Sequence, residues 1–198
     1  MEVIGALHES LVFSRRVRVL GEALAEVLPS SASVLDVGAG DGTIAHLVQG
    51  MRPDIRCEGI DVLVRPVTRI PVSQFDGSTI PFESGSFDVV MFVDVLHHTT
   101  NQVDLLKEAL RVSRRGIVIK DHCRDGLLAS ETLRIMDWVG NARHGVALPY
   151  NYWKRKEWLE TFKRLGVTPQ IWLDDLALYP FPFSLAFDRK LHFLAFLT

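Results

Sequence analysis

The chain has 198 residues, which is enough for one well-packed domain and too few for two of ordinary size. Its 22 basic and 24 acidic residues nearly cancel, and no basic run is interleaved with aromatic residues, so a nucleic-acid-binding face is not expected. The two cysteines, Cys57 and Cys123, form no Cys-x-x-Cys pair, so neither a disulfide framework nor a metal site is indicated, and a reducing cytoplasm is the expected location.

The N-terminal segment lacks the pattern of a secretion signal, because it carries acidic residues and no continuous apolar stretch after a basic start. The most apolar segment, 176–197, is interrupted by prolines and charges, so no membrane span is expected. Apolar residues at helical spacing run from Leu7 to Leu28 and stop before Pro29. This pattern predicts one or two helices ahead of the core.

Short apolar runs then alternate with helical patterns. The predicted strands are 33–37, 56–60, 72–75, 87–93 and 115–120, and the predicted helices between them are 42–50, 63–68 and 101–113. This alternation is typical of an α/β fold, in which a parallel sheet carries helices on both faces.

The rhythm changes after Lys120. A longer amphipathic helix is predicted over 127–141, an aromatic-rich loop over 145–153, a helix over 154–165 closed by Gly166, and two last strands near 168–174 and 190–197. We expect one domain with four parts, namely an N-terminal helical cap (1–30), a cofactor-binding core (33–122), a substrate-specificity insertion (124–153), and a C-terminal helix and hairpin (154–198).

The segment VLDVGAGDG, residues 34–42, ends an apolar run with three glycines spaced two apart and aspartates on both sides of the turn. Glycines permit a sharp turn and let a ligand approach the backbone closely. A dinucleotide fingerprint would require a third glycine where the chain has Thr43. Asp36 and Asp41 would repel a pyrophosphate, but they suit a ligand with ammonium and sulfonium charges and no phosphate. S-adenosylmethionine is such a ligand, and it is favoured over the NAD of an oxidoreductase.

With this loop the chain resembles the class I S-adenosylmethionine-dependent methyltransferases, in particular those that act on small molecules. The resemblance continues through Gly-Ile-Asp at 59–61, through Phe-Asp-Gly-Ser at 75–78 with Ile-Pro-Phe at 80–82, and through FDVVMFVDVLHH at 87–98. It implies a Rossmann-like, doubly wound, seven-stranded sheet with an antiparallel C-terminal hairpin and N-terminal helices over the pocket.

The resemblance also implies the cofactor contacts. Asp61 lies about 20 residues beyond the glycines, the spacing expected of an acidic residue that grips a ribose diol. By resemblance, Asp76 accepts from the adenine amine, and Val93 and Asp94 lie beside the methionine part of the cofactor. The predicted cofactor-binding residues are Asp36, Gly38, Ala39, Gly40, Asp61, Val62, Asp76, Gly77, Val93 and Asp94.

Methyl transfer from a sulfonium requires no metal, but a hydroxyl acceptor would need a base within hydrogen-bond reach. The candidates for that base are Asp94, His97, His98, Asp121, His122 and His144. His122 follows the fifth strand at the edge where such sheets bind ligands, and its imidazole titrates near neutrality. We therefore predict His122 and Asp121 as the catalytic residues.

Several alternatives remain open at this level. His122 could be an ordinary loop histidine, and Arg15 and Arg16 could contact the cofactor carboxylate or a substrate acid, or simply be solvated. An aromatic group could line an acceptor pocket or belong to the core; its members are Trp138, Tyr150, Tyr152 and Trp153. The leading hypothesis is a methyltransferase for a small-molecule substrate, and the alternative is a module that binds S-adenosylmethionine without transferring its methyl group. The acceptor and the oligomeric state stay undetermined.

Overall fold

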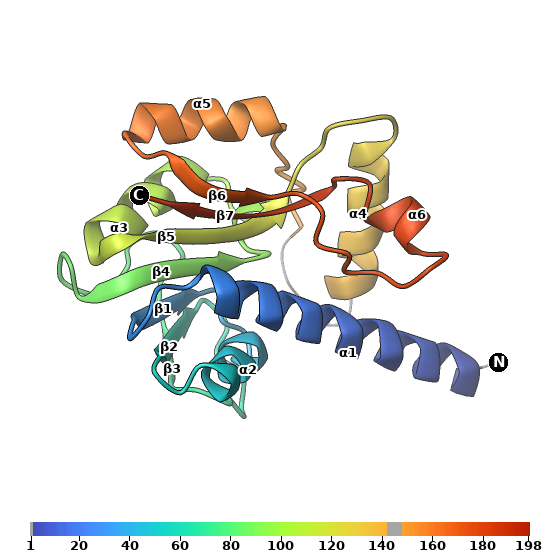
Figure 1. Ribbon diagram of the computed structural model, residues 1–198, viewed down its shortest axis with the longest axis horizontal. Coiled ribbons are helices and arrows are strands. Elements are labelled where there is room, and N and C mark those ends of the chain that lie inside the picture. Colours follow the sequence, from blue (N-terminus) through green and yellow to red (C-terminus); the bar gives the residue numbers. More distant parts are fainter. Residues whose placement is uncertain (1, 142–147) are drawn as a thin grey trace.

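The computed structural model describes residues 2–141 and 148–198 (Figure 1). His144, one of the candidate bases, lies outside the described residues. Seven strands form one sheet in the order β3-β2-β1-β4-β5-β7-β6. Their bounds are β1 Ser33–Val37, β2 Arg56–Asp61, β3 Val72–Gln74, β4 Phe87–Val93, β5 Ser113–His122, β6 Pro169–Leu173 and β7 His192–Leu197.

The first five strands are parallel, and β7 lies antiparallel between β5 and β6. The predicted doubly wound sheet with an antiparallel C-terminal pair is thereby confirmed. β1 and β4 lie in the middle of the sheet, and every residue of these two strands is buried except Ser33, Asp88 and Val93. Parallel strands covered on both faces need such nearly continuous apolar runs, which is why these two strands were clear from the sequence.

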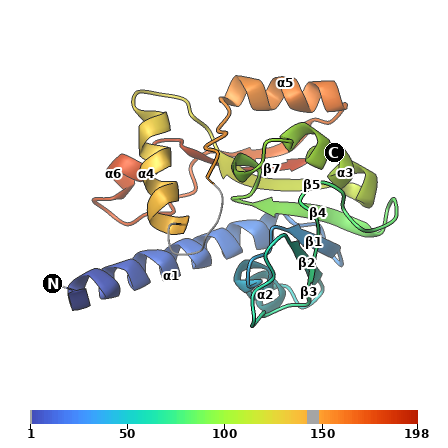
Figure 2. The ribbon, with the colours of Figure 1, turned by 180° about the vertical axis from the view of Figure 1, so that it is seen from behind.

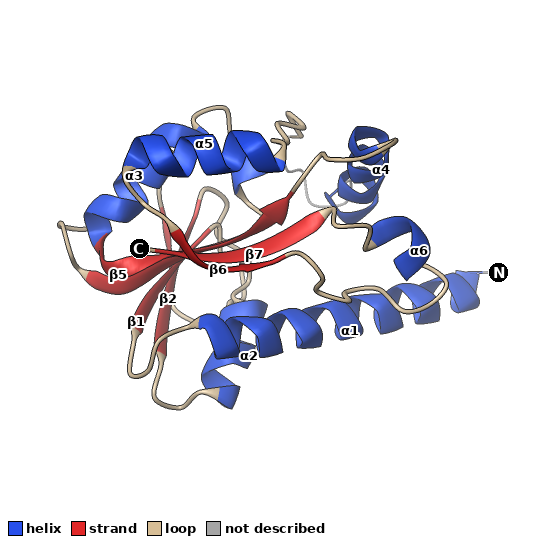
Figure 3. Cartoon of the chain, turned by 45° about the horizontal axis from the view of Figure 1, so that its top comes forward, coloured by secondary structure: helices blue, strands red, loops and turns tan. Residues whose placement is uncertain are grey.

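The helices are α1 Glu2–Val27, α2 Thr43–Met51, α3 Gln102–Val112, α4 Ala129–Asn141, α5 Arg155–Leu165, the short α6 Ser184–Phe187 and the 3-10 helix η1 Leu96–His98. α1 and α2 cover one face of the sheet and α3 and α5 the other, while α4 and α6 lie beyond the ends of the strands (Figures 2 and 3). Leu24 of α1 and Val48 of α2 belong to the core on one face, and Leu106 of α3 and Trp158 of α5 to the core on the other. The sequence predicted one or two helices ahead of the core, and the structure has one continuous helix, α1.

The prediction of a helix over 63–68 is wrong, because the chain runs from β2 to β3 through bends and turns. Pro66 lacks a backbone N–H and would interrupt such a helix, and Pro71 restricts the residue before it. Val62 and Val67 are exposed in this loop.

Candidate active site

The glycine-rich loop after β1 turns sharply at the carboxyl end of the sheet. Gly38 and Gly40 have φ angles of 79° and 58°, a region that favours glycine. A Cβ atom on Gly38 would lie 2.5 Å from the side chain of Val95, whereas a Cβ on Gly40 would meet nothing within 4 Å. The backbone N–H groups of Gly38 and Ala39 both donate to the carbonyl of Ile60, which ties the loop to β2. The loop thus leaves open space at Gly40 for a ligand.

Asp61, at the end of β2, is held against this loop. Its Oδ2 accepts a hydrogen bond from the Gly40 N–H at 2.8 Å, and its Oδ1 accepts one from the Leu63 N–H at 2.8 Å. Each carboxylate oxygen can accept a further hydrogen bond. The predicted ribose-binding carboxylate therefore lies beside the predicted loop in a fixed orientation.

Val62, Asp76 and Gly77 form the next part of this edge. A Cβ atom on Gly77 would lie 3.1 Å from the Val62 side chain, so the two loops meet. Asp76 Oδ1 accepts hydrogen bonds from the backbone N–H groups of Ser78 and Thr79, both at 2.7 Å. These bonds lower the pKa of Asp76, so it is an anionic acceptor on an exposed turn.

The aspartates that flank the glycines differ in their surroundings. Asp36 is buried, and burial together with the charge of Asp61 raises its pKa to about 7. Asp41 is half exposed and lies just before α2, where its carboxylate accepts from both the N–H and the hydroxyl of Thr43. Near neutral pH Asp36 is therefore only partly ionised and contributes only part of a negative charge to the loop.

A pocket of about 220 Å³ lies beside the loop. Its lining residues are Arg16, Val17, Leu20, Ala39, Asp41, Thr43, Ile44, Val93 and Asp94. They come from α1, from the glycine loop with the start of α2, and from the end of β4. Three of the predicted cofactor residues line this pocket, namely Ala39, Val93 and Asp94. One wall of the pocket belongs to α1.

Asp94 is the charged residue at the β4 end of the pocket. Arg16 Nη2 donates to its Oδ2 at 2.6 Å, and the Lys120 ammonium donates to its Oδ1. Burial opposes the negative charge, but Lys120 and Arg16 outweigh it and hold the pKa of Asp94 well below its ordinary value. Arg16 therefore spans from α1 to the sheet edge, while Arg15 donates to the carbonyl of Ala177.

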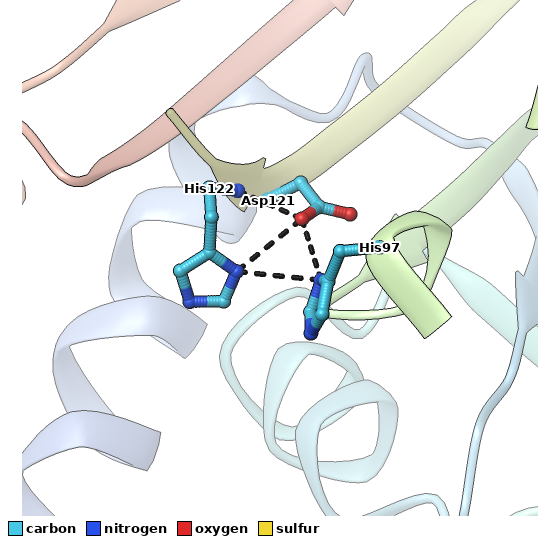
Figure 4. Close-up of side chains that lie close together, drawn as sticks. All are labelled: His97, Asp121 and His122. Atoms are coloured by element: carbon cyan, nitrogen blue, oxygen red, sulfur yellow. Dashed lines mark hydrogen bonds and ion pairs between the residues drawn. The ribbon is translucent and has the colours of Figure 1, made fainter. Parts of the chain in front are cut away.

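Two histidines meet the carboxylate of Asp121 behind this position (Figure 4). His97 Nδ1 donates to Asp121 Oδ1 at 2.6 Å, and His122 Nδ1 lies 3.3 Å from each of these atoms. The backbone N–H groups of Leu96 and His122 also donate to Asp121, whose side chain is fully buried. Asp121 therefore orients the histidines, and neither Asp121 nor His122 is among the residues that line the pocket.

The two histidines differ in charge. Burial lowers the pKa of His97, but Asp121 and Asp137 outweigh it and raise this pKa to about 10. Burial, Lys120 and the charged His97 together lower the pKa of His122 to about 4. At neutral pH His97 is a cation in this state and His122 is neutral.

The network continues into the predicted specificity insertion. His97 Nε2 lies 3.2 Å from Asp137 Oδ1 on α4, and the Tyr152 hydroxyl donates to Asp137 Oδ2 at 2.5 Å. The rings of His97 and Tyr152 stack with centroids 5.4 Å apart. Asp137 and Lys120 are polar residues that the sequence reasoning missed. Lys120 ends a run of buried apolar residues, which could have indicated a buried charge, but no local signal distinguishes Asp137.

The four aromatic residues considered for an acceptor pocket, Trp138, Tyr150, Tyr152 and Trp153, lie in different surroundings. Trp138 is 61% exposed on α4 and does not form a pocket floor. Trp153 packs against Trp158 of the core, with ring centroids 4.7 Å apart. Tyr150 lies next to Tyr152, with centroids 6.3 Å apart. Of this group, Tyr152 lies against the rings of His97 and His122, and Tyr150 lies beside Tyr152.

The methyltransferase domain family matches residues 11–169, most of the chain, and the chain therefore belongs to this family. The sarcosine/dimethylglycine N-methyltransferase of Aphanothece halophytica is 29% identical over 133 residues, which are 57% of this chain and 48% of that protein. The ajmaline N-methyltransferase of Rauvolfia serpentina is 27% identical over 115 residues, which are 50% of this chain and 39% of that protein. The chain thus spans half or less of the length of these relatives.

A solved structure with the same fold comes from the complex between the Haloferax volcanii Trm112 methyltransferase activator and a methyltransferase. It superposes with a TM-score of 0.69 at 15% identity, and the match covers 92% of this chain and 89% of that chain. At this identity the likeness shows the fold alone. The resemblance seen in the sequence is confirmed by the family match and this fold. In the described part of the chain, no helix combines the length and apolar character needed to cross a bilayer.

Proposed function

We propose that the chain binds S-adenosylmethionine and transfers its methyl group to a small-molecule acceptor. The observation that carries this proposal is the contact between Asp61 and the Gly40 N–H beside an open, glycine-lined turn. A carboxylate so placed offers acceptors for ribose hydroxyls while the backbone leaves room for the adenosyl group. The relatives named for sarcosine/dimethylglycine and ajmaline support a small-molecule acceptor.

The pocket residues fit the amino-acid end of this ligand. Arg16 and Asp94 form an ion pair at the pocket wall, and an α-amino acid carries the two opposite charges. Its carboxylate suits Arg16 and its ammonium suits Asp94, so each protein charge keeps an opposite partner when the ligand is bound. Asp94 also keeps Lys120, so it stays anionic throughout.

S-adenosylmethionine supplies a methyl group on a positively charged sulfur, and transfer is a direct displacement with the acceptor, methyl carbon and sulfur nearly in line. The chain contributes mainly by positioning, which can be worth on the order of 7 to 11 kcal/mol of the barrier. Val17 and Leu20 of α1 cover one side of the pocket and limit the access of water. We place the protein in the cytoplasm, where its two free, buried cysteines would stay reduced.

Isothermal titration tests the proposal directly. S-adenosylmethionine and S-adenosylhomocysteine should each bind with one site per chain, and NADH should not bind. Absence of heat with both adenosyl ligands at high protein concentration would refute the proposal. Binding without methyl transfer to any member of a broad panel of amines, hydroxyls and carboxylates would favour the alternative, a module that binds the cofactor only.

His122 is the proposed base for a hydroxyl acceptor. Its Nδ1 faces His97 and Asp121, and within the described residues its Nε2 has no hydrogen-bond partner. Asp121 serves as the residue that positions it. His122→Ala should lower kcat by roughly 100-fold or more and leave cofactor affinity nearly unchanged.

Single-turnover kinetics on the acceptor found in the panel, together with titration of the cofactor, measure the two effects. The exposed His46 on α2 provides the matched control, His46→Ala, which should behave as the wild type. An unchanged kcat in His122→Ala would remove His122 from the reaction.

A further inference from the structure

We propose that the protein binds one divalent transition-metal ion of the zinc type between His97, His98 and Asp137. One potential ligand atom from each of these residues lies within 4.8 Å of the other two. His97 and His98 belong to η1, just beyond β4, and Asp137 belongs to α4. The ion would therefore join the specificity insertion to the edge of the sheet. This site goes beyond the proposed methyl transfer, which it does not require.

The hydrogen bonds of His97 are compatible with a cation at this place. Its Nδ1 lies 2.6 Å from Asp121 Oδ1, and Asp121 acts there only as an acceptor. The hydrogen of a neutral imidazole therefore lies on Nδ1, and the lone pair of Nε2 points at Asp137 Oδ1. A metal ion placed between Nε2 and Oδ1 would accept the lone pairs of both atoms.

The separation of the two atoms fits a metal site as well as an ordinary hydrogen bond. His97 Nε2 and Asp137 Oδ1 are 3.2 Å apart, whereas a hydrogen bond between an imidazolium and a carboxylate is about 2.7–2.9 Å long. The ligand atoms of a tetrahedral zinc site with bonds of about 2.0–2.1 Å are separated by about 3.3 Å. Nε2 and Oδ1 thus already have the separation of two metal ligands.

His98 supplies the third ligand. Its Nδ1 is buried and has no hydrogen-bond partner in the described part of the chain. A buried polar atom without a partner is uncommon in folded proteins. The His98 ring lies against that of His97, with centroids 4.0 Å apart. A metal ion beside this ring gives the His98 imidazole the interaction that the described residues do not provide.

The surrounding residues hold two of the three ligands in place. Asp121 accepts the Nδ1–H of His97, and Tyr152 donates to the other carboxylate oxygen of Asp137. A carboxylate behind a metal-bound histidine is the usual way in which proteins orient such a ligand. The side chains of His97 and Asp137 are 1% and 8% exposed, so water competes little for them. Two imidazoles and one carboxylate suit Zn²⁺ better than Mg²⁺ or Ca²⁺ and leave a fourth position open.

Metal titration of untagged full-length protein, first stripped with a chelator, tests this site. Zn²⁺ should bind with one ion per chain in isothermal titration, and Co²⁺ should give the ligand-field absorption of a four-coordinate ion. Asp137→Asn and His98→Ala should each weaken Zn²⁺ binding at least tenfold. His46→Gln, on the exposed face of α2, should leave it unchanged.

Asp137→Asn preserves the shape of the side chain, and circular dichroism of each variant shows whether it is folded. Absence of Zn²⁺ binding by the folded wild type would overturn the proposal and leave His97 as a doubly protonated cation. Equal Zn²⁺ binding by the wild type and a folded Asp137→Asn or His98→Ala variant would also overturn it. A parallel titration with S-adenosylhomocysteine separates this outcome from a failure of the proposed function.

Discussion

Asp61 links the glycine loop to β2, because one carboxylate accepts backbone hydrogen bonds from Gly40 and Leu63. Asp61→Ala should weaken binding of S-adenosylmethionine by roughly 1 to 3 kcal/mol, since ribose hydroxyls and the Gly40 N–H would both lose their acceptor. Isothermal titration measures the change, with the exposed Asp104→Ala as control. An unchanged affinity would mean that Asp61 does not contact the ligand.

Asp36 makes the stability of the protein depend on pH. Its pKa rises from an ordinary value of 3.8 to about 7 on folding, because the carboxyl group is buried and lies near Asp61. Between these two values the folded state keeps a proton that the unfolded chain has lost. Stability contributed by this group is therefore complete below about pH 4 and falls as pH rises through about 7, by at most about 1.4 kcal/mol per pH unit.

Asp36→Asn should remove this loss, because an amide cannot ionise. Urea unfolding of the wild type and the variant at about pH 5 and about pH 8 measures it. The difference between the two proteins should shift in favour of the variant at the higher pH. A difference that does not change with pH would show that Asp36 ionises alike in both states.

At the scale of elements, the junction between β5 and β7 depends on one glycine. Gly116 has a φ of +136°, and a Cβ atom there would lie 2.1 Å from the carbonyl oxygen of Leu197. Gly116→Ala should destabilise the protein by about 1 to 3 kcal/mol or more, because the backbone is strained and the C-terminal strand must move.

Gly50 in α2 provides a matched comparison. A Cβ atom on Gly50 would meet nothing within 4 Å, and alanine favours a helix by about 0.5–1 kcal/mol over glycine. Gly50→Ala should therefore leave stability unchanged or increase it. Chemical denaturation of both variants measures the contrast. Equal effects of the two substitutions would show that the approach of β7 to Gly116 imposes no constraint.

At the scale of the whole molecule, the pocket joins α1 to the sheet, so ligand binding and folding are linked. S-adenosylhomocysteine at about 100 times its Kd should add about 2.7 kcal/mol of stability. For a chain of this size that corresponds to a rise in Tm of roughly 5–10 °C. Differential scanning calorimetry measures the rise, which should be smaller for Asp61→Ala at the same ligand concentration. A Tm that does not respond to saturating ligand would contradict a site formed by the folded chain.

The sequence was sufficient to predict the strands of the sheet and the positions at which they end. Continuous apolar runs mark buried parallel strands, and the glycines of 34–42 mark the turn, because both signals depend on neighbours along the chain. The strands therefore agree within a few residues, and the predicted loops meet at one edge. The helix predicted over 63–68 does not form, because Pro66 would interrupt it.

The partners of the charged side chains were decided only by the tertiary structure. Arg16 contacts Asp94, and His97 contacts Asp137, although each pair is far apart in the sequence. Sequence alone determined that carboxylates and histidines follow particular strands. The residues of the proposed metal site have no regular spacing that would have indicated them. The pairs form because α1 and α4 pack onto the sheet. Burial and the neighbouring charges then shift the pKa of each group, and these shifts determine which groups are charged.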